Sequence, residues 1–418
     1  MKVIISHPTG NANVRAIAKG FATADKLHRF YTSIACFPKS GVERLGNLPG
    51  FSELKRRNFD RLLQPFTHTF PWTELGRMIS NKTGFRSLTA HETGFFSVDR
   101  VYHSLDKHVA GKLAQSGPAR ATTVYAYEDG ALETFKQAKL LGLTCVYDLP
   151  IAHWKMSRQL MTEEAERLPH WAKTLGGGIA DSNEKLDRKN AELDLADIIV
   201  TPGSFVAHSL NGVINNQKII LSPFGSPSIT ADGAKWESNV EQPLRVLFAG
   251  SLGQRKGLAD LFEAIKILNT KHIELIILGS LLEDLSFYKK ELSSLTYEPT
   301  RSHAEVLALM RSCDVFCLPS IVEGRALVIQ EAMSQCLPII ITPNTGGEDL
   351  VIEGRTGFLV PIRNPWAIAE KLQWFLDNRH RIADMGNYAR QHASGYSWDK
   401  YAADIISEIE CFLMEKAL

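Results

Sequence analysis

The sequence has no apolar run long enough to cross a bilayer. A spanning helix needs about 20 consecutive, mainly apolar residues, and no stretch of the 418-residue chain reaches roughly 18. The first residues, MKVIISHPTG, pass from a short apolar segment directly into a turn, unlike a secretory signal peptide. We therefore expect no spanning or export segment. We expect a cytoplasmic location, which leaves contact with the inner face of the membrane open.

Cysteine is scarce, and its spacing indicates neither a metal cluster nor a disulfide framework. The chain has six cysteines, none of them in a C-x-x-C pair, and most lie in apolar runs. Scattered cysteines of this kind are typical of reduced, buried thiols in a cytosolic protein. They are Cys36, Cys145, Cys313, Cys317, Cys336 and Cys411.

An excess of charge of either sign is also absent. Lysine plus arginine number 47 and aspartate plus glutamate 46, which argues against a nucleic-acid-binding protein that depends on bulk charge. No D-x-D, H-E-x-x-H or Cys/His cluster indicates a metal site, so we expect no metal and no other cofactor. The sequence shows no internal repeats or low-complexity tracts.

What the sequence does contain is an alternation of short apolar runs and helical segments. Because 418 residues exceed what one core usually supports, two domains are expected. The alternation predicts parallel strands with crossover helices in both halves, an α/β fold class with two Rossmann-like domains. We expect a first domain at 1–222, a linker at 223–243, a second domain at 244–395 and a terminal helix at 396–418. The expected strands are Val3–Ile5, Tyr31–Cys36, Thr123–Tyr127, Thr144–Tyr147, Ile198–Thr201, Ile219–Leu221, Leu244–Ala249, Glu274–Leu278, Val315–Leu318 and Ile339–Thr342.

Residues 39–96 interrupt this alternation and read as a helical insertion. Basic residues are interleaved with aromatic ones there, a pattern that can bind an anionic acceptor or a membrane surface. The other interpretation is a packed insertion with a solvated charged face, because four acidic residues dilute the charge. The basic residues are Lys55, Arg56, Arg57, Arg61, Arg77, Lys82 and Arg86, the aromatic ones Phe51, Phe59, Phe66, Phe70, Trp72 and Phe85, and the acidic ones Glu43, Glu53, Asp60 and Glu74.

Three positions in the first half are candidate site residues. The small-residue turn around Gly10 follows the first strand, where the backbone can approach a phosphate or a sugar closely. Asp148 and His153 follow a later strand, at the edge where ligands bind in this architecture. The alternatives are an ordinary turn at Gly10, a helix cap at Asp148 and a helix-start residue at His153.

Two strand-to-helix turns in the second half carry the strongest candidates. The turn over 250–257 is not a P-loop, but Lys256 can neutralise a diphosphate there. In the next such turn lies Glu323, with Glu331 eight positions further along the following helix. The backbone N–H groups and helix dipole of such a turn favour an anion, so a carboxylate needs another reason to be present. Hydroxyl groups of a sugar or a ribose would be that reason.

The stretch from Pro319 to Val360 resembles the signature of glycosyltransferase family 4. A Pro-Ser pair, a Glu-Gly turn, a second Glu followed by Ala, and a downstream Gly-Gly helix start follow one another in the family's order. The likeness is sharp over roughly residues 244–375. The matching residues are Pro319, Ser320, Glu323, Gly324, Glu331, Ala332, Met333, Pro338, Gly346, Gly347, Gly354 and Gly357.

The resemblance implies a GT-B fold with the active site in the cleft between the domains. It implies a metal-independent, retaining transfer of a hexosyl-type sugar from a nucleoside diphosphate donor. The acceptor would be a glycan, a lipid-linked molecule or a small molecule, as in polysaccharide biosynthesis. The implied catalytic residues are Glu323, Lys256 and His153. The implied donor-binding residues are Gly10, Arg255, Lys256, Glu323, Gly324, Arg325, Ala326 and Glu331.

Two departures from the family pattern leave alternatives open. Ser251 stands where the family usually has an arginine that holds the diphosphate, and Arg325 stands where it has an aromatic residue. Arg255 or Arg325 would then replace the missing charge. Another sugar-nucleotide enzyme of this fold, such as a 2-epimerase, and a catalytically silent nucleotide-sugar-binding subunit are the competing hypotheses.

Overall fold

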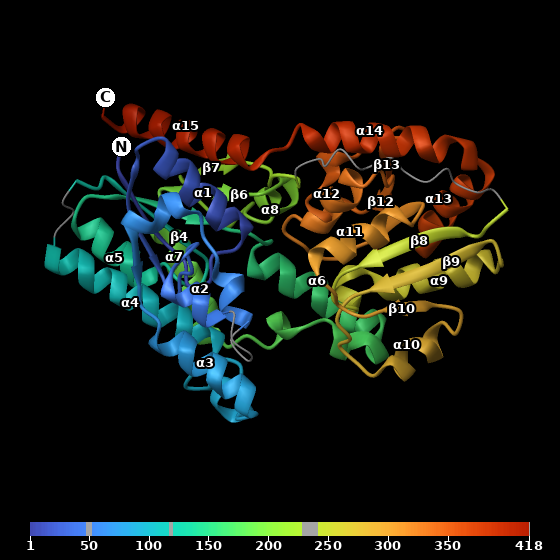
Figure 1. Cartoon of the computed structure of the whole chain (residues 1–418), viewed down its shortest axis with the longest axis horizontal. Coiled ribbons are helices and arrows are strands. Elements are labelled where there is room, and N and C mark those ends of the chain that lie inside the picture. Colours follow the sequence, from blue (N-terminus) through green and yellow to red (C-terminus); the bar gives the residue numbers. More distant parts are fainter. Residues whose placement is uncertain (47–51, 117–119, 228–240, 418) are drawn as a thin grey trace.

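The computed structural model describes residues 1–46, 52–116, 120–227 and 241–417, and in this range the chain forms two α/β domains (Figure 1). Each domain is built on its own parallel sheet flanked by helices, one of seven strands and one of six. The inner strands of both sheets are mostly buried on both faces, as parallel sheets covered by helices require, whereas the edge strands are partly exposed. Most of the linker expected at 223–243 lies outside the described residues.

The first sheet has the strand order β3-β2-β1-β4-β5-β6-β7, with every neighbouring pair parallel. Its strands are β1 (Val3–Ser6), β2 (Leu27–Thr32), β3 (Thr67–Thr69), β4 (Thr123–Tyr127), β5 (Thr144–Asp148), β6 (Ile198–Thr201) and β7 (Lys218–Leu221). The α-helices of this half are α1 (Ala12–Thr23), α2 (Gly41–Gly46), α3 (Trp72–Thr83), α4 (Val98–Ser116), α5 (Leu132–Leu140), α6 (Trp154–Arg167), α7 (Asn183–Leu195) and α8 (Ser204–His208). The 3-10 turns are η1 (Ser52–Arg57), η2 (Arg61–Phe66), η3 (Arg86–Thr89), η4 (Pro169–Thr174) and η5 (Gly177–Ile179).

The second sheet has the order β10-β9-β8-β11-β12-β13 and is also parallel throughout. Its strands are β8 (Leu244–Ala249), β9 (Ile273–Leu278), β10 (Thr296–Glu298), β11 (Val315–Leu318), β12 (Ile339–Ile341) and β13 (Gly357–Leu359). The helices are α9 (Leu258–Leu268), α10 (Leu285–Glu291), α11 (His303–Arg311), α12 (Leu327–Ser334), α13 (Pro365–Asp377), α14 (Ile382–Ser394) and α15 (Trp398–Ala417). The 3-10 turns are η6 (Gln254–Lys256), η7 (Pro343–Thr345), η8 (Glu348–Leu350) and η9 (Arg379–Arg381).

The sequence predicted a helical insertion at residues 39–96, but the segment is not purely helical. It contributes the edge strand β3, which pairs in parallel with β2. Strand β2 itself begins four residues earlier than expected, and Cys36 instead forms an isolated bridge with Asn58 of the segment. The segment is therefore anchored to the first sheet through β3 and to the chain just after β2 through Asn58.

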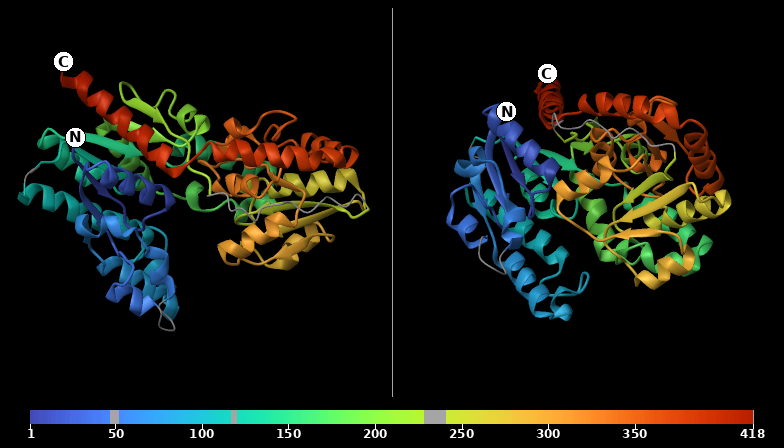
Figure 2. Two further views of the ribbon diagram at one scale, coloured as in Figure 1. Left: turned by 45° about the horizontal axis from the view of Figure 1, so that its top comes forward. Right: turned by 45° about the vertical axis from the view of Figure 1, so that its right-hand side comes forward.

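Two segments tie the domains together. Helix α15 returns from the second domain and lies along the first, as all three ribbon views show (Figures 1 and 2). Its residues Tyr401, Ile405 and Ile409 belong to the same apolar cluster as Val3 and Phe21 of the first domain. In the opposite direction, Trp171 of η4 is buried in the apolar core of the second domain.

No helix in the described part of the chain is long and apolar enough to cross a membrane. All six cysteines are unpaired. Cys411 is exposed, whereas the other five are buried as expected.

Candidate functional site

The turns after β8 and β11 lie side by side at the carboxyl ends of their strands, and they bring three charged side chains together. Lys256 Nζ lies 2.5 Å from Glu323 Oε1, and Arg255 Nη1 lies 3.0 Å from the same oxygen. Arg255 also donates to the carbonyl oxygen of Val322 at 2.9 Å. The structure thus joins Arg255, Lys256 and Glu323, which sequence analysis placed on separate turns, into one cluster.

Glycine allows these two turns to approach so closely. Gly257 has a φ of +73°, and a Cβ atom there would lie 2.0 Å from the carbonyl oxygen of Pro319. Only glycine fits such a contact. The pair Lys256-Gly257 is therefore needed both for its charge and for the backbone contact that brings the charge to Glu323.

Glu323 is held in its ionised form. Burial raises the pKa of its carboxyl group, but the positive charges of Lys256 and Arg255 outweigh burial and bring the pKa below its ordinary value. The carboxylate is therefore charged at neutral pH, and it holds both cations at the domain boundary.

Glycines also line the contact between the two domains next to Glu323. A Cβ atom at Gly324 would lie 1.7 Å from the carbonyl oxygen of Pro150 in the first domain. One at Gly203 of the first domain would lie 2.7 Å from the carbonyl oxygen of Gly346 in the second. The turn that carries Glu323 is thus pressed against the loop after β5, three residues before His153.

Arg325 does not face this cluster, which corrects the expectation that it holds the donor diphosphate. Its side chain is only 1% exposed, and its two terminal nitrogens bind Asp349 at 2.8 and 3.1 Å. The remaining N–H groups donate to Gln330 and to the carbonyl oxygen of Gly346, and the guanidinium lies over the ring of Tyr396. A guanidinium whose donors are occupied in this way links structural segments of the second domain.

The other donor-site candidates of the second domain lie on or before α12. Ala326 is the N-cap residue of this helix, and its own N–H donates to the carbonyl oxygen of Thr345. Glu331 lies on the helix, where its Oε1 is 3.2 Å from Nε2 of the exposed His303 at the start of α11. This contact joins the start of α11 to α12 at Glu331.

In the first domain, Gly10 lies in a turn that is organised by a residue sequence analysis did not single out. The backbone N–H groups of Thr9 and Gly10 both donate to Nδ1 of His7, at 3.0 and 2.9 Å. Burial, and to a lesser degree Arg57, lowers the pKa of His7 to about 3. The imidazole therefore remains neutral and keeps Nδ1 as an acceptor. Gly10 has a φ of +66°, and a Cβ atom there would collide with the ring of Phe59.

Asp148 and His153 have different surroundings. Asp148 is buried and accepts hydrogen bonds from Tyr125 at 2.7 Å and from Tyr401 of α15 at 3.4 Å, and burial raises its pKa to about 7. It is not a helix cap, since His153 is the N-cap residue of α6. Burial lowers the pKa of His153 to about 4, and its Nε2 has no hydrogen-bond partner among the described residues. His153 therefore offers a neutral ring nitrogen.

A cavity of about 220 Å³ lies next to the charged cluster and is lined by both domains. Glu128 and Trp154 line it from the first domain, and Arg255 and Val322 from the second. Lys189 also lines it, with Nζ 2.9 Å from Glu128 Oε1. Glu128 and Lys189 are 61 residues apart in the sequence, so no local pattern indicated them. Arg255 connects this cavity to Glu323.

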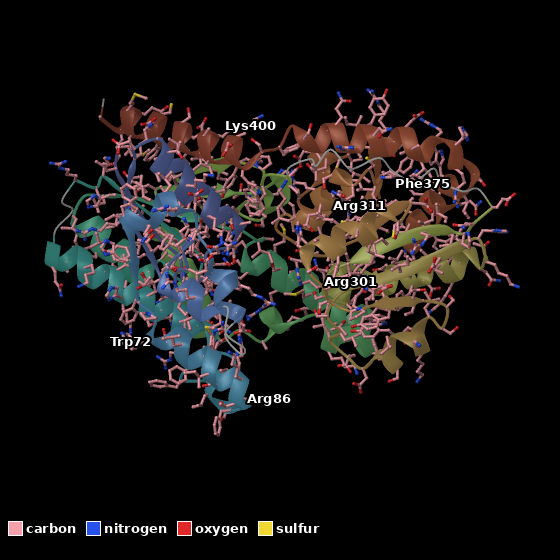
Figure 3. The ribbon with its side chains drawn as sticks, viewed as in Figure 1. Trp72, Arg86, Arg301, Arg311, Phe375 and Lys400 are labelled. Carbon is pink, nitrogen blue, oxygen red and sulfur yellow. The ribbon has the colours of Figure 1, made fainter. Side chains whose placement is uncertain are left out.

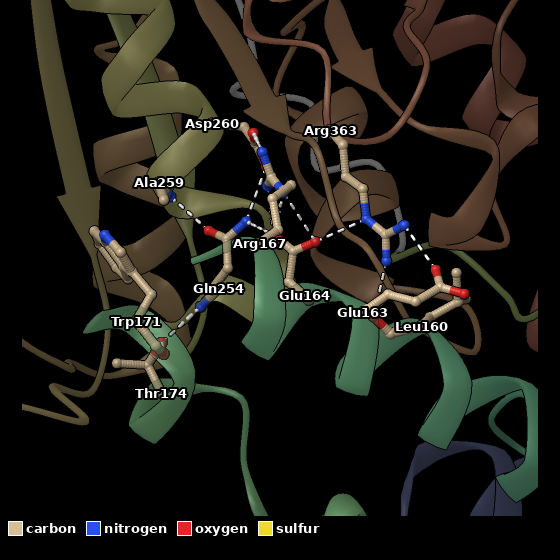
Figure 4. Close-up of polar contacts among 10 residues, drawn as sticks. All are labelled: Leu160, Glu163, Glu164, Arg167, Trp171, Thr174, Gln254, Ala259, Asp260 and Arg363. Atoms are coloured by element: carbon tan, nitrogen blue, oxygen red, sulfur yellow. Dashed lines mark hydrogen bonds and ion pairs between the residues drawn. The ribbon is translucent and has the colours of Figure 1, made fainter. Parts of the chain in front are cut away.

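A buried polar network fixes the turn that carries Arg255 and Lys256 (Figure 4). The side chain of Gln254 donates to Glu164 at 2.7 Å and to Asp260 at 2.8 Å, and it accepts from the N–H of Ala259 at 2.7 Å. Arg167 binds both oxygens of Asp260. Helix α6, which precedes the domain boundary in sequence, is thereby bonded to the second domain beside the charged cluster.

One group of potential metal ligands lies apart from this cluster. His91, Glu92 and Asp181 have ligand atoms within 4.8 Å of one another. His91 Nε2 lies 2.9 Å from Asp181 Oδ1, and Lys185 lies 3.3 Å from the same oxygen. A lysine beside the group opposes a cation, so these contacts read as an ion-pair network between the segment 39–96 and the chain before α7.

The sequence of the second domain, which carries the charged cluster, is similar to known proteins. Residues 232–392 match the family model described as "Glycosyl transferases group 1". This match covers most of the second domain. Among curated relatives, it is 29% identical over 54% of its length to D-inositol 3-phosphate glycosyltransferase of Paenarthrobacter aurescens, covering 53% of that protein. It is 28% identical over 47% of its length to the capsular polysaccharide biosynthesis glycosyltransferase CapM of Staphylococcus aureus, covering 55% of it. The chain spans about half the length of the curated relatives it matches.

Solved structures resemble the whole chain and confirm the predicted GT-B fold. Sucrose-phosphate synthase of Thermosynechococcus elongatus superposes with a TM-score of 0.68 at 16% identity, over 99% of this chain and 100% of that one. Anabaena HepE in complex with UDP gives 0.59 at 16% identity, over 98% and 100%. At these identities the likeness concerns the fold alone.

Proposed function

We propose that this protein is a glycosyltransferase that moves a hexosyl-type sugar from a nucleoside diphosphate donor to a hydroxylated acceptor, with retention and without a metal ion. The observation that carries the proposal is the cluster at the domain boundary, where Lys256 and Arg255 meet the ionised Glu323. Two cations at the carboxyl ends of parallel strands suit a diphosphate, and a carboxylate among them suits a sugar hydroxyl. The group 1 glycosyltransferase domain over residues 232–392 supports it.

The proposed chemistry assigns a role to each charged group. The bond between the anomeric carbon and the diphosphate oxygen breaks while the acceptor oxygen bonds to that carbon on the same face. The acceptor proton passes to the departing diphosphate. Lys256 and Arg255 stabilise the negative charge that develops on that leaving group. Glu323 accepts a hydrogen bond from the transferred sugar, and Glu331 accepts hydrogen bonds from the ribose.

The cavity beside Arg255 is the proposed acceptor site. It is lined by an indole ring from Trp154 and by the charged pair Glu128 and Lys189. An aromatic face together with polar groups of both signs suits a polyol or the end of a glycan. A nucleoside diphosphate donor is supported by relatives of the same fold, since HepE has been solved with UDP and with UDP-glucose.

The test is donor turnover by the purified chain. Nucleoside diphosphate release should be measured over a panel of sugar nucleotides, with and without sugar acceptors and with a chelator present. Lys256→Met is expected to lower kcat/KM, with a loss of transition-state stabilisation of about 3 kcal/mol, because it removes the positive charge beside the leaving group. Glu331→Gln should weaken binding of the free nucleotide as well as the donor, by about 1–3 kcal/mol.

The matched control is Glu370→Gln on the exposed face of α13, which should leave turnover unchanged. Transfer to a second molecule excludes the 2-epimerase alternative, and any donor turnover excludes a silent subunit. Loss of activity in the chelator would refute the metal-independent proposal. Unchanged turnover in Lys256→Met would refute the assigned diphosphate site.

A further inference from the structure

Exposed apolar side chains are concentrated on one short stretch of the first domain. Large apolar residues exposed singly are normal on a protein surface, whereas a group of them marks an interaction site. Trp72 and Phe95 are each 70% exposed and Phe85 is 61% exposed, although all three are aromatic. The full group, called the α3 surface below, is Trp72, Ile79, Phe85, Leu88, Phe95 and Val98.

The α3 surface belongs to one packed unit that projects from the domain. The ribbon views show α3 and the turn after it extending away from the sheet, and Figure 3 places Trp72 and Arg86 on this projection. A Cβ atom at Gly76 would lie 2.2 Å from the ring of Phe96, so α3 rests directly on the segment that carries Phe95. The N–H of Phe96 also donates to the carbonyl oxygen of Leu88 at 2.7 Å. The exposed rings are therefore held by a structured base.

The charges that this unit exposes are positive. Across residues 72–100, all of which the structure describes, the exposed charged residues are Lys82, Arg86 and Arg100. The same stretch has three carboxylates, of which Glu92 is 19% exposed and accepts from the N–H of Ser182, and the other two are buried. Glu74 is fully buried between Arg57 and Arg77, and Asp99 is bound by Lys185 at 3.0 Å.

We propose that the α3 surface docks this protein on an anionic lipid bilayer. Its tryptophan and phenylalanine rings would enter the interfacial region, and Arg86 and Arg100 would contact lipid phosphates. The absence of exposed carboxylates from residues 72–100 favours an anionic bilayer over a protein surface of mixed charge. All of the α3 surface except Val98 lies within residues 39–96, the segment for which the sequence left a membrane contact open. Arg57 of that segment is bound to Glu74 and to the carbonyl oxygen of Thr9, so it is not part of the proposed contact.

Vesicle binding of the purified full chain tests the proposal without any substrate, so the result does not depend on the proposed transfer reaction. Cosedimentation should be compared between vesicles of phosphatidylcholine alone and vesicles that contain phosphatidylglycerol. Binding is expected to the anionic vesicles only and should weaken as salt is raised. A blue shift of tryptophan emission should accompany it and should shrink in Trp72→Phe, because that indole enters the interface.

Two sets of variants separate the contributions. Phe85→Ser with Phe95→Ser should lower the vesicle partition coefficient at least about tenfold, since two rings lose their burial. Arg86→Gln and Arg100→Gln should each lower it about fivefold.

The controls are Trp366→Ser, which removes an equally exposed indole from the second domain, and Lys289→Gln with Lys290→Gln on α10. These control variants should bind vesicles as the unchanged protein does. Equal binding to neutral and anionic vesicles, no binding to either, or α3-surface variants that bind normally would overturn the proposal. The proposal would also be overturned if the α3 surface bound a protein partner and vesicles did not displace that partner.

Discussion

Two arginines near the candidate donor site have opposite surroundings, and this difference decides what each can do. Arg255 is 28% exposed, lines the interdomain cavity and shares Glu323 with Lys256. Arg325 is almost fully buried and spans Asp349, Gln330 and a backbone carbonyl. A partly exposed cation beside a cavity can meet a ligand, whereas a buried one stabilises the segments that it joins.

Substitution of the two arginines should therefore separate stability from turnover. Arg325→Ala is expected to lower the free energy of unfolding by about 2–4 kcal/mol, because it leaves Asp349 and Gln330 without their partner. Arg255→Ala should instead lower kcat/KM for the donor, with a loss of transition-state stabilisation of about 1.5–3 kcal/mol and a smaller loss of folding stability. Denaturant unfolding and donor turnover of both variants check this. A donor-specific defect in a stably folded Arg325→Ala protein would contradict the structural role given to Arg325.

At the scale of elements, η6 and α6 act together. Helix α6 supplies Glu164 and Arg167, and the start of α9 supplies Asp260 and the N–H of Ala259. Between them lies Gln254, the residue before Arg255 (Figure 4). The network is buried, so its members need one another to satisfy their hydrogen bonds. Gln254 is consequently a positioning residue for the two cations.

Gln254→Ala tests this positioning. It should lower the free energy of unfolding by about 1–3 kcal/mol and also raise KM for the donor, because the turn that carries Lys256 loses its support. Arg363→Met is the comparison, since Arg363 donates to Glu164 at 2.7 Å but does not touch the turn. It should destabilise the protein and leave the donor KM unchanged. If both variants changed KM in proportion to their loss of stability, the positioning role would be wrong.

At the scale of the whole molecule, the domains meet through backbone contacts that leave no room for a side chain. Gly324 lies against Pro150, and Gly346 lies against both Gly203 and the carbonyl oxygen of Gly324. Together with α15, which crosses back onto the first domain, these contacts set the distance between the two sheets. The candidate acceptor cavity is lined by both domains at this boundary, and Arg255 joins it to the candidate donor site.

Gly324→Ala should push the domains apart, because its Cβ would lie 1.7 Å from the carbonyl oxygen of Pro150. A displacement of about 1 Å at the reacting groups can reduce turnover on the order of a hundredfold. Gly111→Ala in α4 is the control, since a Cβ atom there meets nothing within 4 Å. Small-angle scattering and turnover measure the two effects. An unchanged scattering profile with full activity would show that the contact is not needed.

The regular parts of the fold follow from local sequence, and the irregular parts do not. Strands β8 and β11 have the predicted bounds. β11 is a continuous apolar run followed by Pro319, and β8 is apolar except for Arg245 and is followed by Gly250. The edge strands β3, β10 and β13 were not predicted. Each is three residues long, too short for a period to appear, and exists only because a neighbouring strand offers it hydrogen bonds.

The candidate site divides in the same way. The sequence by itself determined that Lys256 and Glu323 lie on strand-to-helix turns, since glycine and proline punctuation after apolar runs is a local signal. The tertiary structure decided which charges those residues meet. Arg325 pairs with Asp349, 24 residues further along the chain. Glu128 pairs with Lys189, and α5, β5 and α6 lie between them in the sequence. Burial and charge pairing depend on segments distant in the chain, and a single sequence does not state which of them will be neighbours.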